Sequence, residues 1–430
     1  MGFLRLHPEC RLVEGARNIC LYDCLGGSLA SLHRVESDFV REALGSKPME
    51  ELLQARTPDE RQKIEDCLTK LKERDLGGEY DRPYYIKTIE RGSGPGFISF
   101  FEPTRVRVLF LELTQECPLD CLYCHVPDVF GRGTGCGRYG DLGGPPLAPE
   151  RRRAIFRQAV DLGAGELHLM GGDVLLSPNW EEVLEEALAL GIALVTVWTS
   201  GFTPLPDRWA GDPRVRFAFS VYSHHPEVHD EVAGRPGAHA ALMTNLELLK
   251  AAGGSPFISL VVTSRAEDHW SEAETFYKPY TRLPPRVIPL FPTGDGALTP
   301  TGAGRTLLSA RRWFMRVDPR LLSITQDYHT CFAGKLAIAA DGRVLACPGG
   351  RKWVLGDAKT EDLWAILSAG RHKPYWARAK TRLDKCGRCE FRLACFDCRL
   401  IHGRGESLTS VDFCDYDPDR GEWRSTVAGG

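Results

Sequence analysis

The cysteines of this chain are unevenly distributed, and this constrains the fold more than any other feature of the sequence. The chain has 430 residues and 15 cysteines, of which ten fall into two groups, Cys117 to Cys124 and Cys331 to Cys414. One further cysteine, Cys136, follows the first group, and none lies between it and Cys331. Core cysteines would be scattered, whereas grouped thiolates are typical of metal or cluster ligation in a reducing compartment. The sequence therefore predicts two metal-binding segments.

Composition and charge limit the class of partner. The net charge is -3, which gives no global electrostatic reason to expect nucleic acid or an anionic membrane as a partner. The first residues, MGFLRLHPECRLVEG, contain charges and a proline where a signal peptide has an apolar run, and no stretch of 18 charge-free apolar residues occurs. We therefore expect a cytoplasmic protein of about two to four domains.

Residues 1–90 are expected to form a small α+β domain of short strands followed by three helices. The predicted strands are Phe3–His7, Arg11–Val13, Ile19–Tyr22 and Ser28–Leu32. Ser37 is expected to cap the first helix, and Pro48 opens the second. Thr57 to Glu60 reads Thr-Pro-Asp-Glu, a capping box with proline at the first helical position, and we expect Gly77 to end that third helix.

Residues 105–292 alternate between strands and helices, which is typical of a parallel sheet. The predicted strands are Val106–Leu113, Glu166–Met170, Ala193–Trp198, Val215–Tyr222, Phe257–Thr263 and Val287–Phe291. The predicted helices are Arg151–Leu162, Trp180–Leu190, Ala240–Ala252 and Trp270–Tyr280. Six units are too few for a closed barrel of eight, so we expect an α/β partial (β/α)6 barrel over residues 100–305, with its chemistry at the carboxyl ends of the strands. From residue 326 onward the chain is rich in cysteine and shows little regular patterning.

The first cysteine group follows directly after an apolar strand. Cys117, Cys121 and Cys124 are spaced four and three residues apart, so one loop can hold three irons of a 4Fe–4S cluster, which normally takes four thiolates. The fourth iron would then be open to a small molecule. This Cys-x3-Cys-x2-Cys loop resembles the hallmark of the radical S-adenosylmethionine (SAM) superfamily, and a zinc loop is the alternative. The resemblance implies that SAM chelates the open iron and yields a 5′-deoxyadenosyl radical.

Polar or glycine-rich turns end the next three predicted strands. By resemblance to the same family, Gly171-Gly172-Asp173 corresponds to the Gly-Gly-Glu segment that contacts the SAM amino group, with aspartate in place of glutamate. The resemblance also implies that Tyr123 borders the adenine. The remaining candidate contacts to the SAM ribose or carboxylate are Thr199, Ser200 and Ser220.

The second cysteine group resembles the SPASM domain, the C-terminal extension of radical SAM enzymes that mature peptides and proteins. Its members are Cys331, Cys347, Cys386, Cys389, Cys395, Cys398 and Cys414. The resemblance implies two auxiliary 4Fe–4S clusters in a domain over residues 326–425. Auxiliary cluster I would be held by Cys331, Cys347 and Cys398, and auxiliary cluster II by Cys386, Cys389, Cys395 and Cys414. Cys395 and Cys398 enclose two residues where the family usually has three, and a pair of zinc sites is the alternative.

Auxiliary cluster I lacks a fourth cysteine in this pattern. Either one iron is open, or His329 or Cys136 fills the position. An open iron suggests that a substrate cysteine thiolate binds there and forms a thioether with a carbon radical.

Residues 1–90 resemble the precursor-peptide recognition element of peptide maturases, a winged-helix-like fold. The resemblance implies that a leader peptide adds a strand to the sheet edge and packs against the third helix. A DNA-binding winged helix is the rival interpretation, but 14 Lys and Arg against 17 Asp and Glu in this unit form no basic surface. A purely structural cap is a further alternative.

The resemblances together imply a radical SAM peptide maturase with three 4Fe–4S clusters and SAM. It would install crosslinks, above all cysteine thioethers, in a ribosomally made precursor peptide and would receive electrons from a flavodoxin or ferredoxin. Carbon–carbon or carbon–oxygen crosslinking, epimerisation and sulfatase-maturase-type oxidation are the alternatives. No nucleic-acid or membrane partner is expected. Candidate acids and bases, chosen only because they lie near strand ends, are Glu112, Asp128, His168 and Tyr222.

Overall fold

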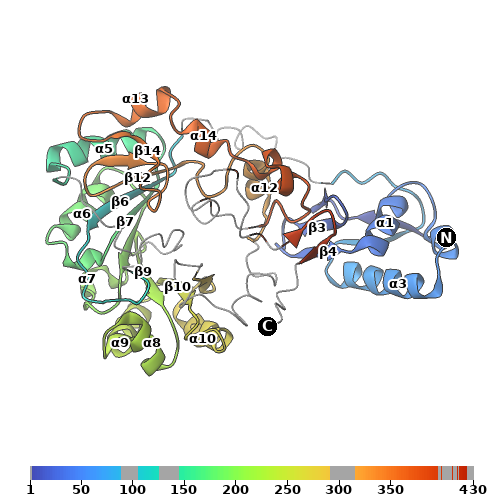
Figure 1. Ribbon diagram of the computed structural model, residues 1–430, viewed down its shortest axis with the longest axis horizontal. Helices are drawn as coiled ribbons and strands as arrows, with labels where there is room; N and C mark the ends of the chain where they lie inside the picture. Colours follow the sequence, from blue (N-terminus) through green and yellow to red (C-terminus); the bar gives the residue numbers. More distant parts are fainter. Residues whose placement is uncertain are drawn as a thin grey trace, which may run out of the picture.

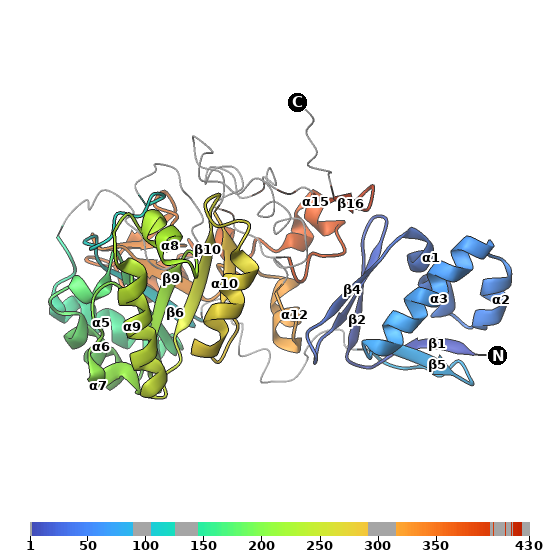
Figure 2. The ribbon, with the colours of Figure 1, turned by 90° about the horizontal axis from the view of Figure 1, so that it is seen from below.

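The computed structural model describes residues 2–88, 105–124, 145–290, 315–395, 399, 409, 414 and 416–423. The molecule is elongated (Figure 1). A large unit around a curved sheet lies at one end, the N-terminal unit lies at the other, and C-terminal elements such as α12 lie between them in both ribbon views (Figure 2). Among the helices of the described ranges, none is long and apolar enough to cross a membrane.

The large unit contains a nine-stranded sheet of order β11-β10-β9-β8-β7-β6-β12-β13-β14. Neighbours from β11 through β12 pair in parallel, and β13 and β14 continue the sheet antiparallel. The strands are β6 (Val108–Thr114), β7 (Glu166–Gly171), β8 (Leu194–Thr199), β9 (Val215–Val221), β10 (Phe257–Val262), β11 (Arg286–Pro289), β12 (Lys335–Ile338), β13 (Arg343–Leu345) and β14 (Val354–Asp357).

Helices cover the outer face of this sheet (Figure 1). They are α5 (Pro149–Asp161), α6 (Trp180–Ala189), α7 (Asp207–Ala210), α8 (Pro226–Ala233), α9 (Ala238–Ala251), α10 (Trp270–Tyr277) and α13 (Leu363–Ser368). Alternate strand residues such as Leu109 and Leu111 join the helices in one large buried core. The residues between them face the concave side, where Met170 and Trp198 form a smaller cluster. The open parallel sheet with helices on its outside confirms the predicted partial barrel.

Two features of this unit depart from the sequence prediction. Helices α7 and α8 were not predicted. The segment after residue 326, expected to have little regular structure, contributes β12, β13 and β14 to the main sheet, and Leu336 pairs with Leu109 of β6. The predicted units 100–305 and 326–425 therefore share one sheet.

The N-terminal unit has an antiparallel sheet of order β2-β3-β4 and a separate β1-β5 pair. Its elements are β1 (Phe3–Leu6), β2 (Cys10–Glu14), β3 (Ile19–Asp23), β4 (Leu29–Leu32), α1 (Arg34–Ala43), α2 (Met49–Gln54), α3 (Pro58–Glu73) and β5 (Gly77–Tyr80). Ile19 and Leu21 of β3 face the helices, whereas Cys20 and Tyr22 face the C-terminal segment. Strand β3 is thus buried on both faces.

Two predicted helix boundaries in this unit were wrong. Ser37 lies inside α1, where its hydroxyl accepts a hydrogen bond from Ile19 N (3.0 Å) and donates to Leu32 O (2.6 Å), so it links the helix to the end of the β3-β4 ladder. Gly77 begins β5, because α3 ends at Glu73 and the left-handed Asp75 (φ 55°) turns the chain into that strand. The capping box of Thr57 and Glu60 is confirmed.

The remaining C-terminal elements are short. They are α12 (Pro319–Thr325), α14 (Lys373–Trp376), α15 (Asp384–Gly387), β15 (Tyr416–Asp417) and β16 (Glu422–Trp423). Helix α14 packs on the large core, and the others lie near the last cysteines. Val13 and Tyr22 of the N-terminal sheet pack with Phe391, Leu393 and Tyr416 in one buried cluster. The N-terminal unit is therefore docked on this segment.

Candidate active site

The first cysteine loop follows β6 at the carboxyl edge of the parallel strands. Cys121 is 8% exposed, and Cys117 and Cys124 are half-buried beside it in one cluster. Cys124 N donates to Cys121 O (2.8 Å), so a tight turn folds the last two cysteines together. Burial, and then the negative charge of Cys124 and Cys117, raises the pKa of Cys121 to about 12. Three converging thiolates of this kind are stable only with a bound cation, which fits an iron–sulfur cluster.

Two tyrosines wall this loop on one side. Tyr222, directly after β9, places its hydroxyl 3.1 Å from Cys121 Sγ. Tyr123 donates a hydrogen bond to Tyr222 Oη (3.1 Å), and their rings meet edge to face at 5.8 Å. Tyr222 was a candidate acid or base only because it lies near a predicted strand end. In the structure it contacts the first cysteine loop. Contact between Tyr123 and adenine stays a prediction.

The C-terminal end of helix α8 (Pro226–Ala233) is hydrogen-bonded to the same loop. Asp120 N and Leu122 N donate to the carbonyls of Ala233 and Val232 (3.1 and 3.0 Å). Gly234, left-handed at φ 67°, ends the helix, and a Cβ there would lie 2.2 Å from Asp120 O. This contact was not predicted because α8 itself was not predicted. Pro226 at the first helical position and Gly234 after the last turn are nevertheless helix boundary signals.

The Gly171-Gly172 turn passes directly against the cluster loop. Gly171 has φ 137°, and a Cβ on it would lie 2.0 Å from Thr114 O. A Cβ on Gly172 would lie 2.1 Å from Glu116 O, and Gly172 N donates to Thr114 O (2.9 Å). The glycine turn was predicted to contact SAM, and the close approach seen here is to the protein's own loop. Their contact with SAM stays a prediction.

Asp173 is fully buried and joins the ends of β7 and β8. Its Oδ2 accepts hydrogen bonds from Ser200 Oγ (2.5 Å), Ser200 N (3.3 Å) and Thr203 Oγ1 (3.3 Å), and its Oδ1 accepts one from Leu175 N (3.1 Å). Both carboxylate oxygens thus accept hydrogen bonds within the protein, whereas the sequence predicts a salt bridge to the SAM amino group. That contact also stays a prediction.

The other predicted SAM-binding residues lie at the same edge. Thr199 is buried, and its Oγ1 accepts a hydrogen bond from Gly201 N (3.2 Å). Ser200 and Ser220 are 7% and 1% exposed at the ends of β8 and β9. The structure gathers these residues around the first cysteine loop, and their roles toward SAM remain predictions.

Two further candidate acids and bases, Glu112 and His168, also have structural partners. Glu112 Oε2 accepts hydrogen bonds from Arg351 Nη1 (2.9 Å) and Ala340 N (3.1 Å), so it ties β6 to the C-terminal part of the sheet. His168 contacts Glu166 (2.9 Å) and accepts a hydrogen bond from Trp198 Nε1 (3.0 Å) on the concave face. Asp128 lies outside the described residues, as does Cys136.

Three of the last cysteines converge at the end of the chain. Cys389, Cys395 and Cys414 border one buried cluster, and burial, followed by the charge of Cys395, raises the pKa of Cys389. Cys386 is joined to them through a turn, with Cys389 N donating to Cys386 O (3.1 Å). All four thiols are free of disulfides, so the donor set fits a cluster with four thiolates. Ammonium groups hold two of these segments, because Lys385 donates to Cys414 O (2.7 Å) and Lys380 to Cys395 O.

Cys331 and Cys347 flank the β12-β13 hairpin. Ala337 pairs with Leu345, and extending this register by two residues places Lys335 opposite Cys347. Lys335 lies four residues after Cys331, so the two cysteines lie toward the same end of the hairpin. His329 Nδ1 accepts a hydrogen bond from Cys331 N (3.1 Å), which holds the imidazole next to that cysteine. Cys398 lies outside the described residues, so its place in this set remains a prediction.

Hydrogen bonds to backbone carbonyls join the N-terminal sheet to the last cysteine loop. Tyr22 Oη donates to Glu390 O (2.6 Å), and Ala16 N donates to Arg388 O (2.7 Å). Arg392 Nη1 donates to Glu14 O (2.6 Å) in the opposite direction. The residues on either side of Cys389 are thus fixed by strands β2 and β3 and the turn between them.

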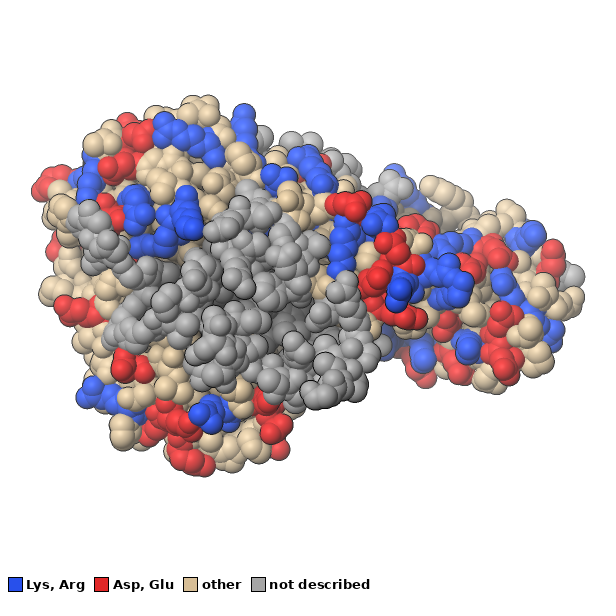
Figure 3. Space-filling model, viewed as in Figure 1, with Lys and Arg blue, Asp and Glu red and all other residues tan. Residues whose placement is uncertain are grey.

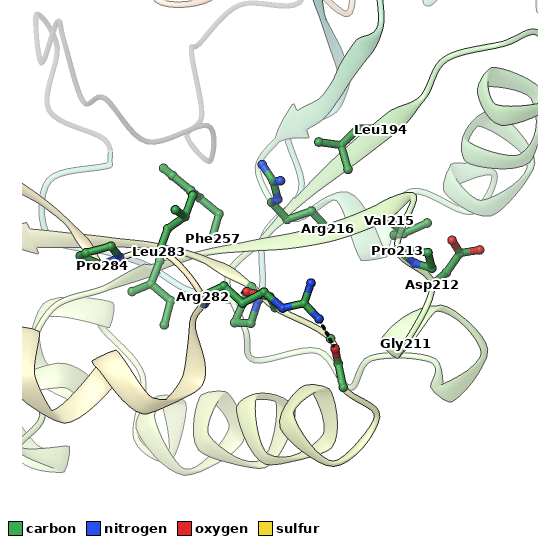
Figure 4. Close-up of a pocket in the computed structure, with 15 residues that line it drawn as sticks. Leu194, Gly211, Asp212, Pro213, Val215, Arg216, Phe257, Arg282, Leu283 and Pro284 are labelled. Atoms are coloured by element: carbon green, nitrogen blue, oxygen red, sulfur yellow. Dashed lines mark hydrogen bonds between the residues drawn. The ribbon is translucent and has the colours of Figure 1, made fainter. Parts of the chain in front are cut away.

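A cavity of about 360 Å³ lies at the opposite, amino end of β8, β9 and β10 (Figure 4). Arg216 and Phe257 line it from the strands, and Arg282 donates to Gly253 O (3.2 Å) across its floor. None of the described residues that line it is a cysteine or histidine. Because the thiols and glycine turns gather at the other edge, we place the chemistry there. Charges of both signs are mixed over the visible face of the N-terminal unit (Figure 3).

Comparison with known families agrees with this geometry. Residues 111–274 match the model of the Radical SAM superfamily. That range holds the first cysteine loop, the glycine turn and Ser220. It is therefore a radical SAM domain, and enzymes with such a domain use a 4Fe–4S cluster and SAM.

Similar individual proteins fall into several activities. AdoMet-dependent heme synthase of Methanosarcina barkeri is 23% identical over 361 residues, 73% of this chain and 97% of that protein. PqqA peptide cyclase of Xanthomonas axonopodis pv. citri is 30% identical over 128 residues, which is 29% of this chain and 32% of the cyclase.

Two solved structures share the fold. The anSMEcpe structure with bound AdoMet and Cp18Cys peptide has a TM-score of 0.52 at 16% identity and covers 71% of this chain and 92% of its own. Streptococcus suis SuiB bound to precursor peptide SuiA has a TM-score of 0.50 at 14% identity and covers 95% of this chain and 98% of its own.

Proposed function

We propose that this radical SAM enzyme modifies a ribosomally made precursor peptide bound through its leader, and that it forms intramolecular cysteine thioethers. Three units carry out the work: residues 1–90 bind the leader, residues 100–305 generate the radical, and residues 326–425 hold two auxiliary clusters. A flavodoxin or ferredoxin supplies the electron. When bound, the reduced cluster and SAM would supply the carbon-centred radical that removes hydrogen from the peptide.

The main structural support for a peptide substrate is the edge strand β4. Because Asp23 N donates to Ser28 O, the pairs Asp23/Ser28 and Leu21/Ala30 are the hydrogen-bonded ones. The backbone groups of Leu29 and Ser31 therefore point away from β3, toward the open side of the sheet. An extended peptide can bind such an edge as a further strand.

Helix α3 lies next to this edge, as leader binding by strand addition requires. Arg74, which follows α3, donates from Nη1 to Leu29 O (3.0 Å). The guanidinium thus already occupies one outward carbonyl, and a bound peptide amide would replace it at this position. Arg74 would then be free to pair with an acidic group of the leader.

The extent of structural similarity also favours a precursor peptide. The SuiB likeness, in a structure with a bound precursor peptide, spans 95% of this chain, whereas the anSMEcpe likeness spans 71%. A sulfatase-maturase-type oxidase would not need the N-terminal unit. The 30% identity to a peptide cyclase supports the same class over a shorter range. The longer match to a haem synthase leaves a porphyrin as the substrate of the rival hypothesis, which the outward backbone groups of β4 do not favour.

Ligand supply distinguishes the two auxiliary clusters. Cys386, Cys389, Cys395 and Cys414 can close auxiliary cluster II. Auxiliary cluster I has Cys331, Cys347 and Cys398, with His329, Cys136 or a substrate thiolate as its fourth ligand. Thioether formation removes one hydrogen atom from carbon, one proton from sulfur and one electron. An auxiliary iron–sulfur cluster would accept the electron, and the peptide becomes two hydrogens lighter per ring.

The mass of the peptide tests this proposal. The enzyme is co-expressed anaerobically with the short reading frame nearest its gene, and the intact mass and cysteine alkylation of the product are recorded. Loss of two hydrogens together with loss of one alkylatable cysteine is the expected result. Loss of two hydrogens with every cysteine still reactive would replace the thioether by a carbon–carbon or carbon–oxygen bond. An unchanged mass would be followed by analysis of residue chirality for epimerisation.

A strand-edge variant tests leader binding separately. Ser31→Pro removes an outward N–H without breaking a β3-β4 hydrogen bond, because proline is tolerated where that N–H faces outward. We expect at least about tenfold weaker binding of the leader by fluorescence anisotropy, equivalent to about 1.4 kcal/mol. Ser31→Ala keeps the N–H and should bind as the parent does. Equal binding by both variants would exclude this edge as the leader site.

A further inference from the structure

Five of the 12 histidines of the chain gather beyond the ends of β9 and β10. His224 and His225 lie in the loop between β9 and α8, with ring centroids 3.9 Å apart. His269 directly precedes α10, and its ring lies 5.2 Å from that of His225. Behind them, the rings of His229 and His239 are 5.4 Å apart. The gathering therefore joins one loop to the start of one helix.

A carboxylate lies at the centre of the outer three imidazoles. Glu272, in the first turn of α10, places Oε2 3.8 Å from His224 Nε2 and 3.6 Å from His269 Nδ1. One ligand atom each of His224, His225 and Glu272 lie within 4.8 Å of one another. His269 and Glu272 are three residues apart, a spacing that presents both to one side of a helix. Small rotations of these side chains would bring four ligand atoms to a common centre.

The backbone around this group is already fixed. Tyr277 Oη, on α10, donates to Ser223 O (2.8 Å), and Ser223 Oγ accepts a hydrogen bond from His225 N (3.1 Å). The loop and the helix therefore keep their spacing without a bound ion.

We propose that His224, His225, His269 and Glu272 form a binding site for one divalent transition-metal ion of the zinc type. Imidazole nitrogen with one carboxylate suits zinc and its neighbours, whereas calcium and magnesium take oxygen ligands. The Glu272 side chain is 66% exposed and that of His224 18% exposed, so an ion has an open approach and retains room for water. The ion would join the β9–α8 loop to α10 and is independent of the iron–sulfur ligands and of the proposed peptide substrate.

A second group of possible ligands on the N-terminal unit provides a contrast. His7, Glu9 and Asp75 also have ligand atoms within 4.8 Å of one another. There the only imidazole already contacts Asp75 O (3.0 Å) and Asp75 Oδ1 (3.2 Å), and the Asp75 side chain is 85% exposed. One paired imidazole with exposed carboxylates is a poor zinc site, so this group serves as the matched control.

The test uses the full chain, with its iron–sulfur clusters assembled anaerobically. The protein is incubated with zinc chloride, dialysed, and analysed for zinc and iron and by X-ray absorption at the zinc edge. Zinc on this site should show nitrogen and oxygen ligands at about 2.0–2.1 Å, whereas zinc on cysteines would show sulfur at about 2.3 Å.

The parent chain is expected to retain about one zinc more than the double variant His224→Ala/Glu272→Gln. The control His7→Ala/Asp75→Asn should retain as much zinc as the parent. Equal iron content in all three proteins shows that the variants fold. If the parent and the His224 variant retain equal zinc, or if the zinc lost in the variant was bound by sulfur, the proposal is overturned.

Discussion

The two described cysteine loops are held in place by different means. The loop of Cys117 to Cys124 follows a central strand and is fixed by the glycine turn after β7 and by the end of α8, all within one barrel. The loop of Cys386 to Cys395 has little regular structure of its own. It packs against β3, where Tyr22 donates a hydrogen bond to Glu390 O from 368 residues earlier in the chain. One site is therefore local to its fold, whereas the other is assembled from both ends of the chain.

This difference separates the stages of the reaction that each loop should control. The local site sits at the strand ends, where we place SAM, and should suffice for radical formation. The assembled site connects the C-terminal segment to the unit proposed to bind the leader. Changes to the contacts between the N-terminal sheet and the second loop should therefore affect that loop and leave the first intact.

The largest effects should come from removing a thiolate from each loop. Cys121→Ala is expected to reduce formation of 5′-deoxyadenosine to background, because the first cluster loses a ligand. Cys414→Ala should retain SAM cleavage but give no crosslinked peptide. Chromatography of deoxyadenosine and mass spectrometry of the peptide measure the two outcomes. Cys67→Ala, a buried cysteine in the N-terminal core, is the control and should keep both activities. If Cys414→Ala also stopped SAM cleavage, the two stages would not be separable.

A matched pair of glycine substitutions should separate the loops without touching a ligand. Gly172→Ala places a Cβ 2.1 Å from Glu116 O on the first loop, and Gly15→Ala places one 2.5 Å from Glu390 Oε2 and 2.8 Å from Asn18 O near the second. Each requires a backbone or buried side-chain shift, which costs on the order of 1–3 kcal/mol. Iron analysis with Mössbauer spectroscopy should show loss of the SAM-binding cluster in the first variant and of an auxiliary cluster in the second. The opposite pattern would contradict the comparison.

The barrel could be predicted from the sequence because its strands are long apolar runs with helices of regular period between them. The same rule could not find α8, since Pro226–Ala233 is short and largely polar. It also missed the pairing of β12 with β6, because β12 has four residues and its partner lies more than 200 residues away along the chain. Such pairing depends on tertiary contacts that local periodicity does not encode.

The site was predicted unevenly for a similar reason. Spacing alone identified the cysteine loops, and the structure brings Cys117, Cys121 and Cys124 together as expected. The glycine turn was predicted as a SAM contact, but its close approach to Thr114 and Glu116 follows only from the sheet register. The docking of Tyr22 on Glu390 was likewise hidden, because alternation in β3 indicates two faces and does not say what covers the second.

Removing single tyrosine hydroxyls tests the long-range contact between Tyr22 and Glu390 with a smaller change. Tyr22→Phe leaves the carbonyl of Glu390 without its 2.6 Å hydrogen bond, and Tyr277→Phe does the same to Ser223 O in the barrel. Each should cost about 1–3 kcal/mol of local stability, because a buried acceptor loses its donor. Only Tyr22→Phe should change the spectrum or reduction potential of an auxiliary cluster. If both variants or neither did so, the contact through Tyr22 would not be what supports the second loop.

The smallest expected effect is a pH dependence of the clamp on the first loop. Burial, and then the neighbouring His239, lowers the pKa of His229 on α8 to about 3, against the opposing charge of Asp230. The unfolded segment takes up a proton below about pH 6.5, whereas the folded one does not until about pH 3, so stability is full above pH 6.5 and is lost as the pH falls toward 3. Neutral His229 also accepts a hydrogen bond from Tyr222 N (3.5 Å), beside the loop. Amide hydrogen exchange across α8, corrected for intrinsic rates, should show about 1 kcal/mol less protection at pH 5.5 than at pH 7.5. His229→Gln should abolish this difference and His7→Gln should keep it, whereas an equal loss in all three proteins would assign the acid sensitivity to other groups.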